Sequence, residues 1–376
     1  MRRVRANYSK GTVTGVHRIV TLEVIAAEWE PDLQLLAAVS SDEEKNAIAQ
    51  LQDSGLSNLG WIESASLEVG DVVVSRPDTA ECVVLYREVD VHHALQITNQ
   101  CNSYCLMCSQ PPTKQDDPWV VNQTLEVIRH IRTSPDAIGL SGGEPLLHGP
   151  GLRRVIEKIA RLHPTTHIEV LTNGRLFAQK SIIKTVLAGL NCDVSWLIPL
   201  YGHADIVHDF VVQSPGAFEE TIAGLLTLQE NHQAVQLRVV LIEPVLRILP
   251  ELCAFVGRNL PFVREVALMA CEPIGFALAN RELCEVELVD WAEVLKKSAN
   301  VLKRYRVPFV FMNTPLCALP QDLWKNARRS ISDWKNVYVS ECDDCSVKIQ
   351  CAGLFAWHED GWKPTRIQAL RGIIHE

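Results

Sequence analysis

The sequence lacks any long hydrophobic run. None of its apolar stretches reaches the roughly 18 residues that a membrane-spanning helix requires. No apolar segment of signal-peptide length follows the basic start MRRVRANYSKGTVTG either. We therefore expect a soluble, cytoplasmic protein that does not bind a membrane.

An excess of positive charge is missing as well. The formal net charge is -9 and the pI is near 5.8, whereas surfaces that bind nucleic acid cluster Lys and Arg. Nucleic acid is therefore not an expected partner. Hydrophobic residues make up 47% of the 376 residues, which is enough apolar material for a globular protein of two or three domains of about 100 to 200 residues each.

A fourth ligand is missing beside a group of three cysteines. The stretch LQITNQCNSYCLMCSQP contains Cys101, Cys105 and Cys108 in a C-x3-C-x2-C spacing, and neither His nor Cys occurs in the next 20 residues. A structural zinc site needs four ligands. Three thiolates can instead hold an iron–sulfur cluster that leaves one iron open to an outside ligand. A zinc site that borrows a distant His or Cys remains the alternative.

The other cysteines divide into a second group and five single residues. In a reducing compartment, clustered cysteines indicate metal ligands or redox groups rather than disulfides. The second group consists of Cys317, Cys342, Cys345 and Cys351. The single cysteines, which we expect to be small buried apolar residues, are Cys82, Cys192, Cys253, Cys271 and Cys284.

From about residue 91 to residue 308, short apolar runs alternate with amphipathic stretches. The predicted strands are 95–98, 137–140, 168–171, 194–200, 235–242 and 263–269, and the predicted helices are 120–131, 152–162, 181–190, 218–229 and 288–305. Such alternation predicts an α/β fold with parallel strands and right-handed crossovers. Because six units fall short of the eight in a closed barrel, we predict an incomplete (β/α)6 TIM-like barrel or an open parallel sheet.

The flanking segments differ from this central part. Residues 1–90 contain short β-branched runs between turn-rich stretches, which predicts a small β-rich domain with a hairpin over Asp71–Tyr86. Residues 309–376 form a cysteine-rich extension. We therefore predict three domains, at 1–90, 91–308 and 309–376.

Three unusual motifs follow the first three predicted strands. The cysteine motif follows the first, SGGEP (Ser141–Pro145) follows the second, and LTNG (Leu171–Gly174) closes the third. Because the carboxyl ends of parallel strands meet at one rim, these motifs are expected to converge there.

In this order, the motifs resemble those of the radical S-adenosylmethionine (SAM) superfamily, over residues 92 to about 275. The resemblance implies a [4Fe-4S] cluster whose open iron binds the methionine moiety of SAM, and one-electron cleavage of SAM to a 5'-deoxyadenosyl radical. It also implies an electron donor such as flavodoxin or ferredoxin. Carried over to this sequence, Cys101, Cys105 and Cys108 would hold the cluster.

The resemblance assigns further residues to SAM. Gly142, Gly143 and Glu144 would face the methionyl amino group, and Met107 would cover the adenine in a position that is often aromatic. Further candidates for contacts to the methionyl or ribose groups are Thr172, Asn173 and Ser195, which could equally be ordinary polar residues at strand ends.

Residues Ile198–Leu228 resemble a region of peptide-modifying members of the superfamily, with His-Asp followed by Gly-x-Phe. The Arg that often follows His-Asp is absent after Asp209, and Arg238 on the next strand is a candidate replacement for its contact with the cofactor carboxylate. We expect His203 and His208 to face solvent or cap a helix rather than to transfer protons.

The C-terminal cysteines resemble the shortened SPASM extension called a twitch domain, which binds one auxiliary [4Fe-4S] cluster. Cys317, Cys342, Cys345 and Cys351 would supply all four ligands, and a four-cysteine structural zinc site is the alternative.

The whole layout resembles the His-Xaa-Ser system radical SAM maturases (HxsC). This resemblance implies a ribosomally synthesised peptide substrate and a partner radical SAM maturase. A radical SAM enzyme with a small-molecule substrate, or a metal-binding scaffold without activity, are the alternatives. Glu243 and Glu272, near strand ends, are candidate acid or base groups.

Overall fold

The computed structural model describes residues 2–372. The chain divides into two compact units. The first contains residues up to Gln96 together with Pro118–Gly139 and Arg154–Ile168, and the second contains Ile97–Asp117, Leu140–Arg153 and the residues from Glu169 onward. The predicted three-domain organisation remains a prediction.

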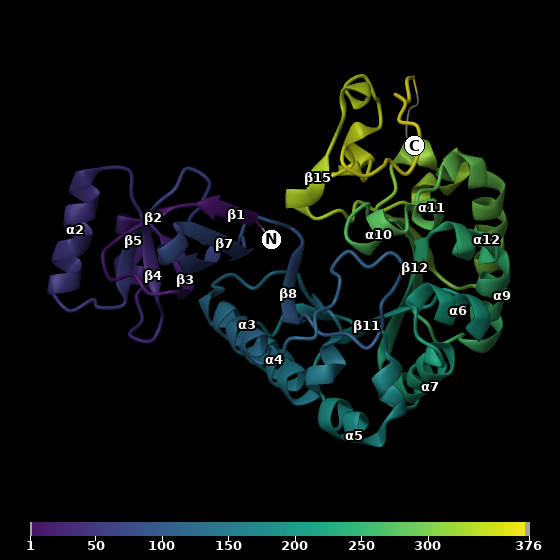
Figure 1. Cartoon of the computed structure of the whole chain (residues 1–376), viewed down its shortest axis with the longest axis horizontal. Helices are drawn as coiled ribbons and strands as arrows, with labels where there is room; N and C mark the ends of the chain where they lie inside the picture. The colour runs from purple at the N-terminus through teal and green to yellow at the C-terminus, as the bar shows by residue number, and fades with distance from the viewer. Residues whose placement is uncertain (1, 373–376) are drawn as a thin grey trace. The chain divides into compact units, whose positions relative to one another are not determined.

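The N-terminal part of the first unit is built on a seven-stranded mixed sheet (Figure 1). Its strand order is β1-β7-β6-β3-β4-β5-β2. The strands are β1 (Arg2–Arg5), β2 (Asn7–Tyr8), β3 (Gly15–Val20), β4 (Leu35–Ala38), β5 (Leu59–Glu63), β6 (Val72–Arg76) and β7 (Glu81–Tyr86). Antiparallel pairing of β6 with β7 confirms the predicted hairpin.

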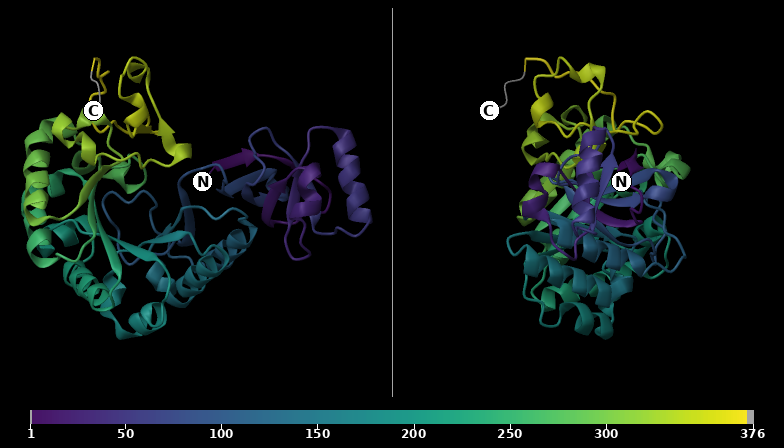
Figure 2. Two further views of the ribbon diagram at one scale, coloured as in Figure 1. Left: turned by 180° about the vertical axis from the view of Figure 1, so that it is seen from behind. Right: turned by 90° about the vertical axis from the view of Figure 1, so that its left-hand side faces the viewer.

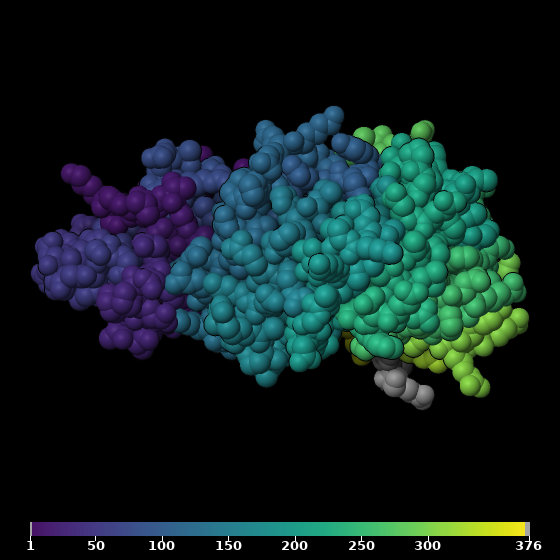
Figure 3. Space-filling model, turned by 90° about the horizontal axis from the view of Figure 1, so that it is seen from below, coloured from purple at the N-terminus to yellow at the C-terminus, as the bar shows by residue number. Residues whose placement is uncertain are grey.

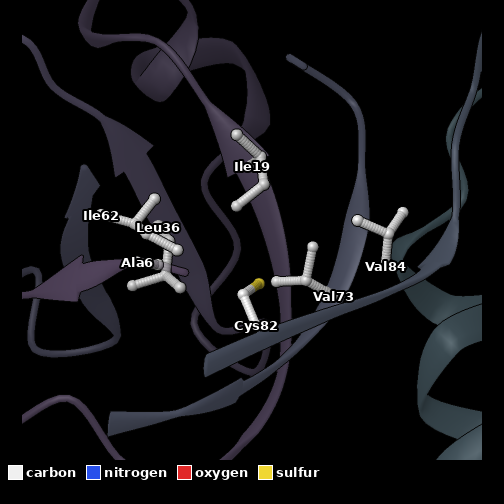
Figure 4. Packing of buried hydrophobic residues seen from close by; sticks show 7 residues of the cluster. All are labelled: Ala6, Ile19, Leu36, Ile62, Val73, Cys82 and Val84. Atoms are coloured by element: carbon white, nitrogen blue, oxygen red, sulfur yellow. The ribbon is translucent and has the colours of Figure 1, made fainter. Parts of the chain in front are cut away.

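Alternating residues of these strands form the core of this sheet. On one face, seven buried residues pack together, as Figure 4 shows: Ala6, Ile19, Leu36, Ile62, Val73, Cys82 and Val84. A second cluster includes Ile48 of α2 (Asp42–Asp53) and Ile25 of α1 (Ile25–Glu28). A capping box formed by Ser41 and Glu44 starts α2.

The second sheet also has seven strands, in the order β14-β13-β12-β11-β10-β9-β8. They are β8 (His93–Thr98), β9 (Ala137–Gly142), β10 (His167–Leu171), β11 (Val194–Pro199), β12 (Ala234–Leu241), β13 (Glu265–Ala270) and β14 (Phe309–Met312). The pairs β11–β12, β12–β13 and β13–β14 are parallel. This is the predicted α/β fold with a parallel sheet, and it is consistent with a partial barrel.

The seventh strand, β14, was not among the six predicted. Its four residues, FVFM, are all buried, so they show no alternation that would mark a strand. Pairing with β13 brings this segment, predicted to begin the extension, into the sheet.

Helices follow the strands of this sheet. They are α3 (Trp119–His130), α4 (Gly149–Leu162), α5 (Lys180–Ile182), α6 (Asp205–Val212), α7 (Ala217–Glu230), α8 (Glu243–Leu246), α9 (Leu249–Asn259), α10 (Phe276–Ala279), α11 (Arg281–Cys284) and α12 (Ala292–Tyr305). In the second unit, α7, α9 and α12 lie on the outer side of β11–β13 (Figure 2). In the space-filling view, the middle of the chain, drawn in teal and green, lies on the face turned to the viewer (Figure 3).

The C-terminal segment has little regular structure. It contains a short antiparallel pair, β15 (Asn336–Val337) and β16 (Leu354–Phe355). Across the residues that the structure describes, no helix is long and apolar enough to cross a membrane.

Candidate active site at the carboxyl ends of the strands

The three clustered cysteines lie in a loop that directly follows β8. We call residues 101–108 the cysteine loop. The backbone N–H of Cys108 donates a hydrogen bond to the carbonyl of Cys105 at 3.0 Å, which turns the chain between these two residues. All three thiols are free and partly buried.

Backbone hydrogen bonds fix one side of the cysteine loop to the end of α6. The N–H of Tyr104 donates to the carbonyl of Val212 at 3.0 Å, and the N–H of Leu106 donates to the carbonyl of Val211 at 2.9 Å. These bonds resemble a short ladder and constrain the loop without any contribution from its side chains.

The segment around α10 fixes the other side. The N–H of Phe276 donates to the carbonyl of Cys108 at 2.9 Å, and Asn280 Nδ2 donates to the carbonyl of Leu106 at 3.0 Å. Gly275 has φ of 66°, and a Cβ atom there would clash with the Cys108 carbonyl. Glycine is therefore required for this close approach.

Arg175, which the sequence analysis did not single out, is a third anchor. Its side chain is 9% exposed, and it donates to the carbonyl of Asn102 at 2.7 Å and to Ser103 Oγ at 2.9 Å. It also reaches Glu220 Oε2 at 2.7 Å and Ser214 Oγ at 2.9 Å. One guanidinium thus connects the cysteine loop to α7 and to the turn before it.

The surroundings of the thiols favour their protonated form when no metal is bound. Burial, together with the nearby charge of Glu144, raises the pKa of Cys101 to about 11. Burial and the neighbouring thiols raise the pKa of Cys105 far above its ordinary value, and burial also raises that of Cys108. Because metals bind thiolates, a bound metal centre must supply the positive charge that allows these three thiols to lose their protons.

These observations fit a cluster held by one loop. The three thiols lie on one loop of eight residues whose backbone is fixed on two sides. Among residues 2–372, no group of three or more His, Cys, Asp and Glu side chains is arranged to hold a single metal ion. Met107, the candidate cover for adenine, is 7% exposed.

The two glycines of the SGGEP motif pack against the backbone that leads into the cysteine loop. A Cβ atom at Gly142 would clash with the carbonyl of Thr98, and one at Gly143 with that of Gln100. The Gly143 N–H donates to the Thr98 carbonyl at 2.9 Å, and the Glu144 N–H donates to the Gln100 carbonyl at 2.7 Å. The motif therefore holds the end of β9 against the end of β8.

The carboxylate of Glu144 is buried and accepts hydrogen bonds from several donors. Oε1 accepts from Thr172 Oγ1 at 2.5 Å and from the Leu146 N–H at 2.9 Å, and Oε2 accepts from the Asn173 N–H at 2.7 Å. Burial raises the pKa of Glu144, while these donors act to lower it. Asn173 Nδ2 also donates to Asn102 Oδ1 at 2.6 Å. The structure thus brings Glu144, Thr172 and Asn173 together beside the cysteine loop.

Ser195 lies apart from this group. It is the second residue of β11, near the amino end of the strand, and it pairs with Ala234. Thr172, at the rim, donates its N–H to the carbonyl of Leu197, further along the same strand. The rim end of β11 instead leads to Tyr201.

Arg238 lies on β12 with few partners. Its Nε donates to Gln236 Oε1 at 2.9 Å, and its Nη1 lies 3.8 Å from Met269 Sδ. Within the part of the chain that the structure describes, no carboxylate forms an ion pair with Arg238. Burial lowers the pKa of Arg238, because desolvation disfavours the cation, while the nearby charges of Glu169 and Glu265 act to raise it.

The His-Asp and Gly-x-Phe residues build a helix start. Asp209 accepts from the N–H groups of Gly216 at 2.6 Å and Phe218 at 2.7 Å, which caps α7. His208 is buried, and its Nδ1 accepts from the Tyr201 N–H at 3.2 Å. Burial lowers the pKa of His208 to about 4, so it is neutral at pH 7. His203 is exposed, as expected, whereas His208 is buried and accepts a backbone hydrogen bond instead of facing solvent or capping a helix.

Tyr201 was also missed by the sequence analysis. It is 6% exposed, and burial together with the nearby Cys105, Cys108 and Cys271 raises its pKa well above the ordinary value. Its phenol is therefore neutral beside the cysteine loop. A single Tyr after a strand carries no distinctive spacing, so the sequence offered no signal for it.

The two glutamates considered as acid or base groups form ion pairs. Glu272 Oε1 accepts from Lys335 Nζ at 3.0 Å, and Glu243 pairs with Arg247 one helical turn away. Both carboxylates are therefore engaged in this structure.

The four C-terminal cysteines line one small cavity of about 20 Å³: Cys317, Cys342, Cys345 and Cys351. Apolar side chains such as Leu316 and Val347 complete its walls. The backbone N–H groups of Leu316 and Gly353 donate to Cys351 Sγ at 3.3 Å and 3.5 Å. Such N–H groups stabilise a thiolate and tune a bound cluster. The structure thus brings the four cysteines of the second group to one cavity.

The single cysteines behave as expected from their isolation in sequence. Cys82, Cys253, Cys271 and Cys284 are buried, and Cys192 is partly buried.

Comparison with known proteins identifies the central region. Residues 95–246 match the model of the Radical SAM superfamily. A GTP 3',8-cyclase from Streptomyces coelicolor is 29% identical over 109 residues, which are 27% of this chain and 31% of that protein. The match therefore spans less than a third of that relative.

Radical SAM proteins are also among the solved structures that match part of this chain, at TM-scores below 0.5. A radical SAM methyltransferase from Sphaerobacter thermophilus has a TM-score of 0.42 at 16% identity, with 64% of this chain and 68% of that chain covered. The structure of anSMEcpe with bound AdoMet and Cp18Cys peptide has a TM-score of 0.44 at 14% identity, with 57% and 62% covered. By the family match, residues 95–246 are a radical SAM superfamily domain, which implies a [4Fe-4S] cluster and SAM.

Proposed function

We propose that this protein is a radical SAM enzyme that modifies a ribosomally synthesised peptide. The observation that carries its catalytic part is the meeting of the cysteine loop with Gly142–Glu144 and Thr172–Asn173 at one rim. In this proposal Cys101, Cys105 and Cys108 hold a [4Fe-4S] cluster with an open iron. When bound and reduced, that cluster supplies the electron that cleaves SAM to a 5'-deoxyadenosyl radical.

The neighbouring residues then position the loop and the cofactor. Arg175, Phe276 and Asn280 hold the backbone of the cysteine loop. Since the Glu144 carboxylate already has its donors, we assign it to fixing Thr172 and Asn173. The carbonyl edge of Gly142–Gly143 is then left for the methionyl amino group.

Arg238 is proposed to bind the carboxylate of SAM. It is a partly buried guanidinium that forms no ion pair with the described residues, and carboxylate is the anion that its fork geometry suits. This contact replaces the one expected from the Arg that is absent after Asp209.

The cavity formed by the C-terminal cysteines is proposed to hold an auxiliary [4Fe-4S] cluster. Four thiolates complete its coordination, so it has no open iron for SAM. Electron transfer or substrate positioning is then its role. A flavodoxin- or ferredoxin-type electron donor and a partner radical SAM maturase complete the proposed system.

Peptide modification rests on the resemblance to HxsC and to twitch-domain enzymes, and the tail cavity supports it. The second candidate is a small-molecule substrate, which the similarity to a GTP 3',8-cyclase favours. Incubating the reduced enzyme and SAM separately with His-Xaa-Ser repeat peptides and with GTP separates the two. A mass change on the peptide supports peptide modification. Conversion of GTP without a mass change on the peptide would instead support the second candidate, a small-molecule substrate.

A further inference from the structure

The outer edge of the N-terminal sheet carries a feature that the proposed chemistry does not use. β1 lies at the end of the sheet and pairs only with β7 on its inner side. Within residues 2–372, no strand pairs with its outer side. Val4 packs against the buried cluster of Figure 4, so the core anchors β1 in place.

The hydrogen-bond register shows which backbone groups of β1 point outward. The N–H of Ala6, the residue after β1, donates to the carbonyl of Ala80 on the β7 side at 3.1 Å. Residues alternate in the direction of their backbone groups along a strand, so Val4 also points toward β7. Arg3 and Arg5 therefore direct their N–H and carbonyl groups to the open edge.

The side chains of these two residues are exposed and have no partners. Arg3 and Arg5 are both exposed on the same face of β1. Neither forms an ion pair or side-chain hydrogen bond with the rest of the described chain, whereas the adjacent Arg2 pairs with Asp90 at 3.2 Å. Two free guanidinium groups thus accompany the free backbone groups in a chain of net charge -9.

Charge determines which strand can complete this edge. A second copy of β1 added antiparallel would place arginines opposite arginines, which is unfavourable. A segment with Asp or Glu at alternate positions would instead place a carboxylate beside each guanidinium while its backbone completes the ladder.

We propose that the β1 edge binds an extended acidic segment of a peptide as an added strand. This inference rests on the proposed function in taking that segment to belong to the peptide substrate. Binding at this edge does not require the cluster or SAM.

Fluorescence anisotropy with the full chain tests the proposal. The probe is a fluorescein-labelled eight-residue peptide that alternates Glu and Val, and the control peptide carries Lys in place of Glu. The acidic peptide is expected to bind at least about tenfold more tightly, an advantage that falls as salt is raised. The double variant Arg3→Glu, Arg5→Glu should reverse this preference, and the double variant Lys303→Glu, Arg304→Glu, at two exposed residues in the last turn of α12, is the charge-matched control.

A second arm tests the backbone pairing. The same acidic peptide is N-methylated at alternate residues, so that the backbone N–H groups along one of its own edges cannot donate hydrogen bonds. This peptide should lose most of its binding affinity. Undiminished binding of that peptide would overturn strand addition, and equal binding of the acidic and basic peptides would overturn the charge match. Dimers that the acidic peptide does not dissociate would show that a second copy occupies the edge.

SAM cleavage, measured in parallel, separates this inference from the proposed function. The Arg3→Glu, Arg5→Glu variant should cleave SAM at the parental rate without peptide. Peptide binding without SAM cleavage by the parent would leave the edge proposal standing and reject the proposed function. SAM cleavage without peptide binding would reject the edge proposal and leave the proposed function standing.

Discussion

At the scale of single residues, Arg175 shows how much of the site depends on contacts distant in sequence. Its guanidinium bonds residues 73 positions earlier and 45 positions later in the chain. The cysteine spacing and the two glycines could be predicted because each motif is contiguous. Arg175 and Tyr201 could not, since their importance comes from the residues that folding brings around them.

Replacing Arg175 with Lys should loosen the cysteine loop, because an ammonium cannot reproduce the several directed bonds of the guanidinium. We expect a loss of about 1–3 kcal/mol in the free energy of unfolding, as for leaving buried hydrogen-bonding groups without a partner, and lower iron content after anaerobic reconstitution. Glu220→Gln, which removes only the ion pair, is the control. Equal iron content in Arg175→Lys and the parent would exclude the anchoring role.

Gly275 supplies a second residue-scale prediction. Gly275→Ala should lower iron content, because it adds a clash with the Cys108 carbonyl to the cost of positive φ, which is of the order of 1–3 kcal/mol. Gly189 has φ of 64° with open space around it, so Gly189→Ala isolates the backbone cost alone. Both variants would be assayed for iron per chain. The same iron content in both would contradict the close packing of Gly275.

At the scale of elements, strands with alternating or continuous apolar runs were predictable and shorter or irregular elements were not. All six predicted strands occur in the parallel sheet, with ends shifted by up to two residues. β14 was missed because its four residues are all apolar and buried, so they show no alternation of apolar and polar side chains. The predicted helix 181–190 is instead a short α5 followed by a wider π-type turn over Ile183–Leu187. Asp209 of the His-Asp motif caps α7, which the sequence alone did not show because its partners lie seven and nine residues later.

The C-terminal cavity gives the element-scale prediction. Replacing Cys342 and Cys345 together with Ala should remove about four irons per chain, the content of one cubane. SAM cleavage without peptide should survive, because the cysteine loop is untouched, while product formation should fall much further. Iron and zinc analysis with product assays checks this. Unchanged iron with lost zinc would identify a structural zinc site instead.

At the scale of the whole molecule, buried neutral histidines link stability to pH. Burial lowers the pKa of His130 to about 3 and that of His208 to about 4, and it also lowers that of His17. Above pH 6.5 these residues are neutral in both the folded and unfolded chain. Below it, the unfolded chain takes up protons that the folded chain does not, so stability falls as the pH falls.

We therefore expect the free energy of unfolding to decrease from about pH 6.5 toward pH 4, by up to roughly 1.4 kcal/mol per pH unit for each of these residues. Urea unfolding at a series of pH values measures this decrease. His130→Leu should show a shallower dependence than the parent. An identical pH dependence in the variant would mean that His130 titrates normally in the folded protein.

The central claim is that Cys101, Cys105 and Cys108 hold a cluster that cleaves SAM. Its most direct test is 5'-deoxyadenosine production by anaerobically purified protein after reduction, measured for the parent, Cys108→Ala and the control Cys82→Ala. The parent is expected to contain about eight irons per chain, as two cubanes require, and to form deoxyadenosine. Cys108→Ala should form none, whereas Cys82→Ala should retain this activity. Full deoxyadenosine production by Cys108→Ala would contradict the account.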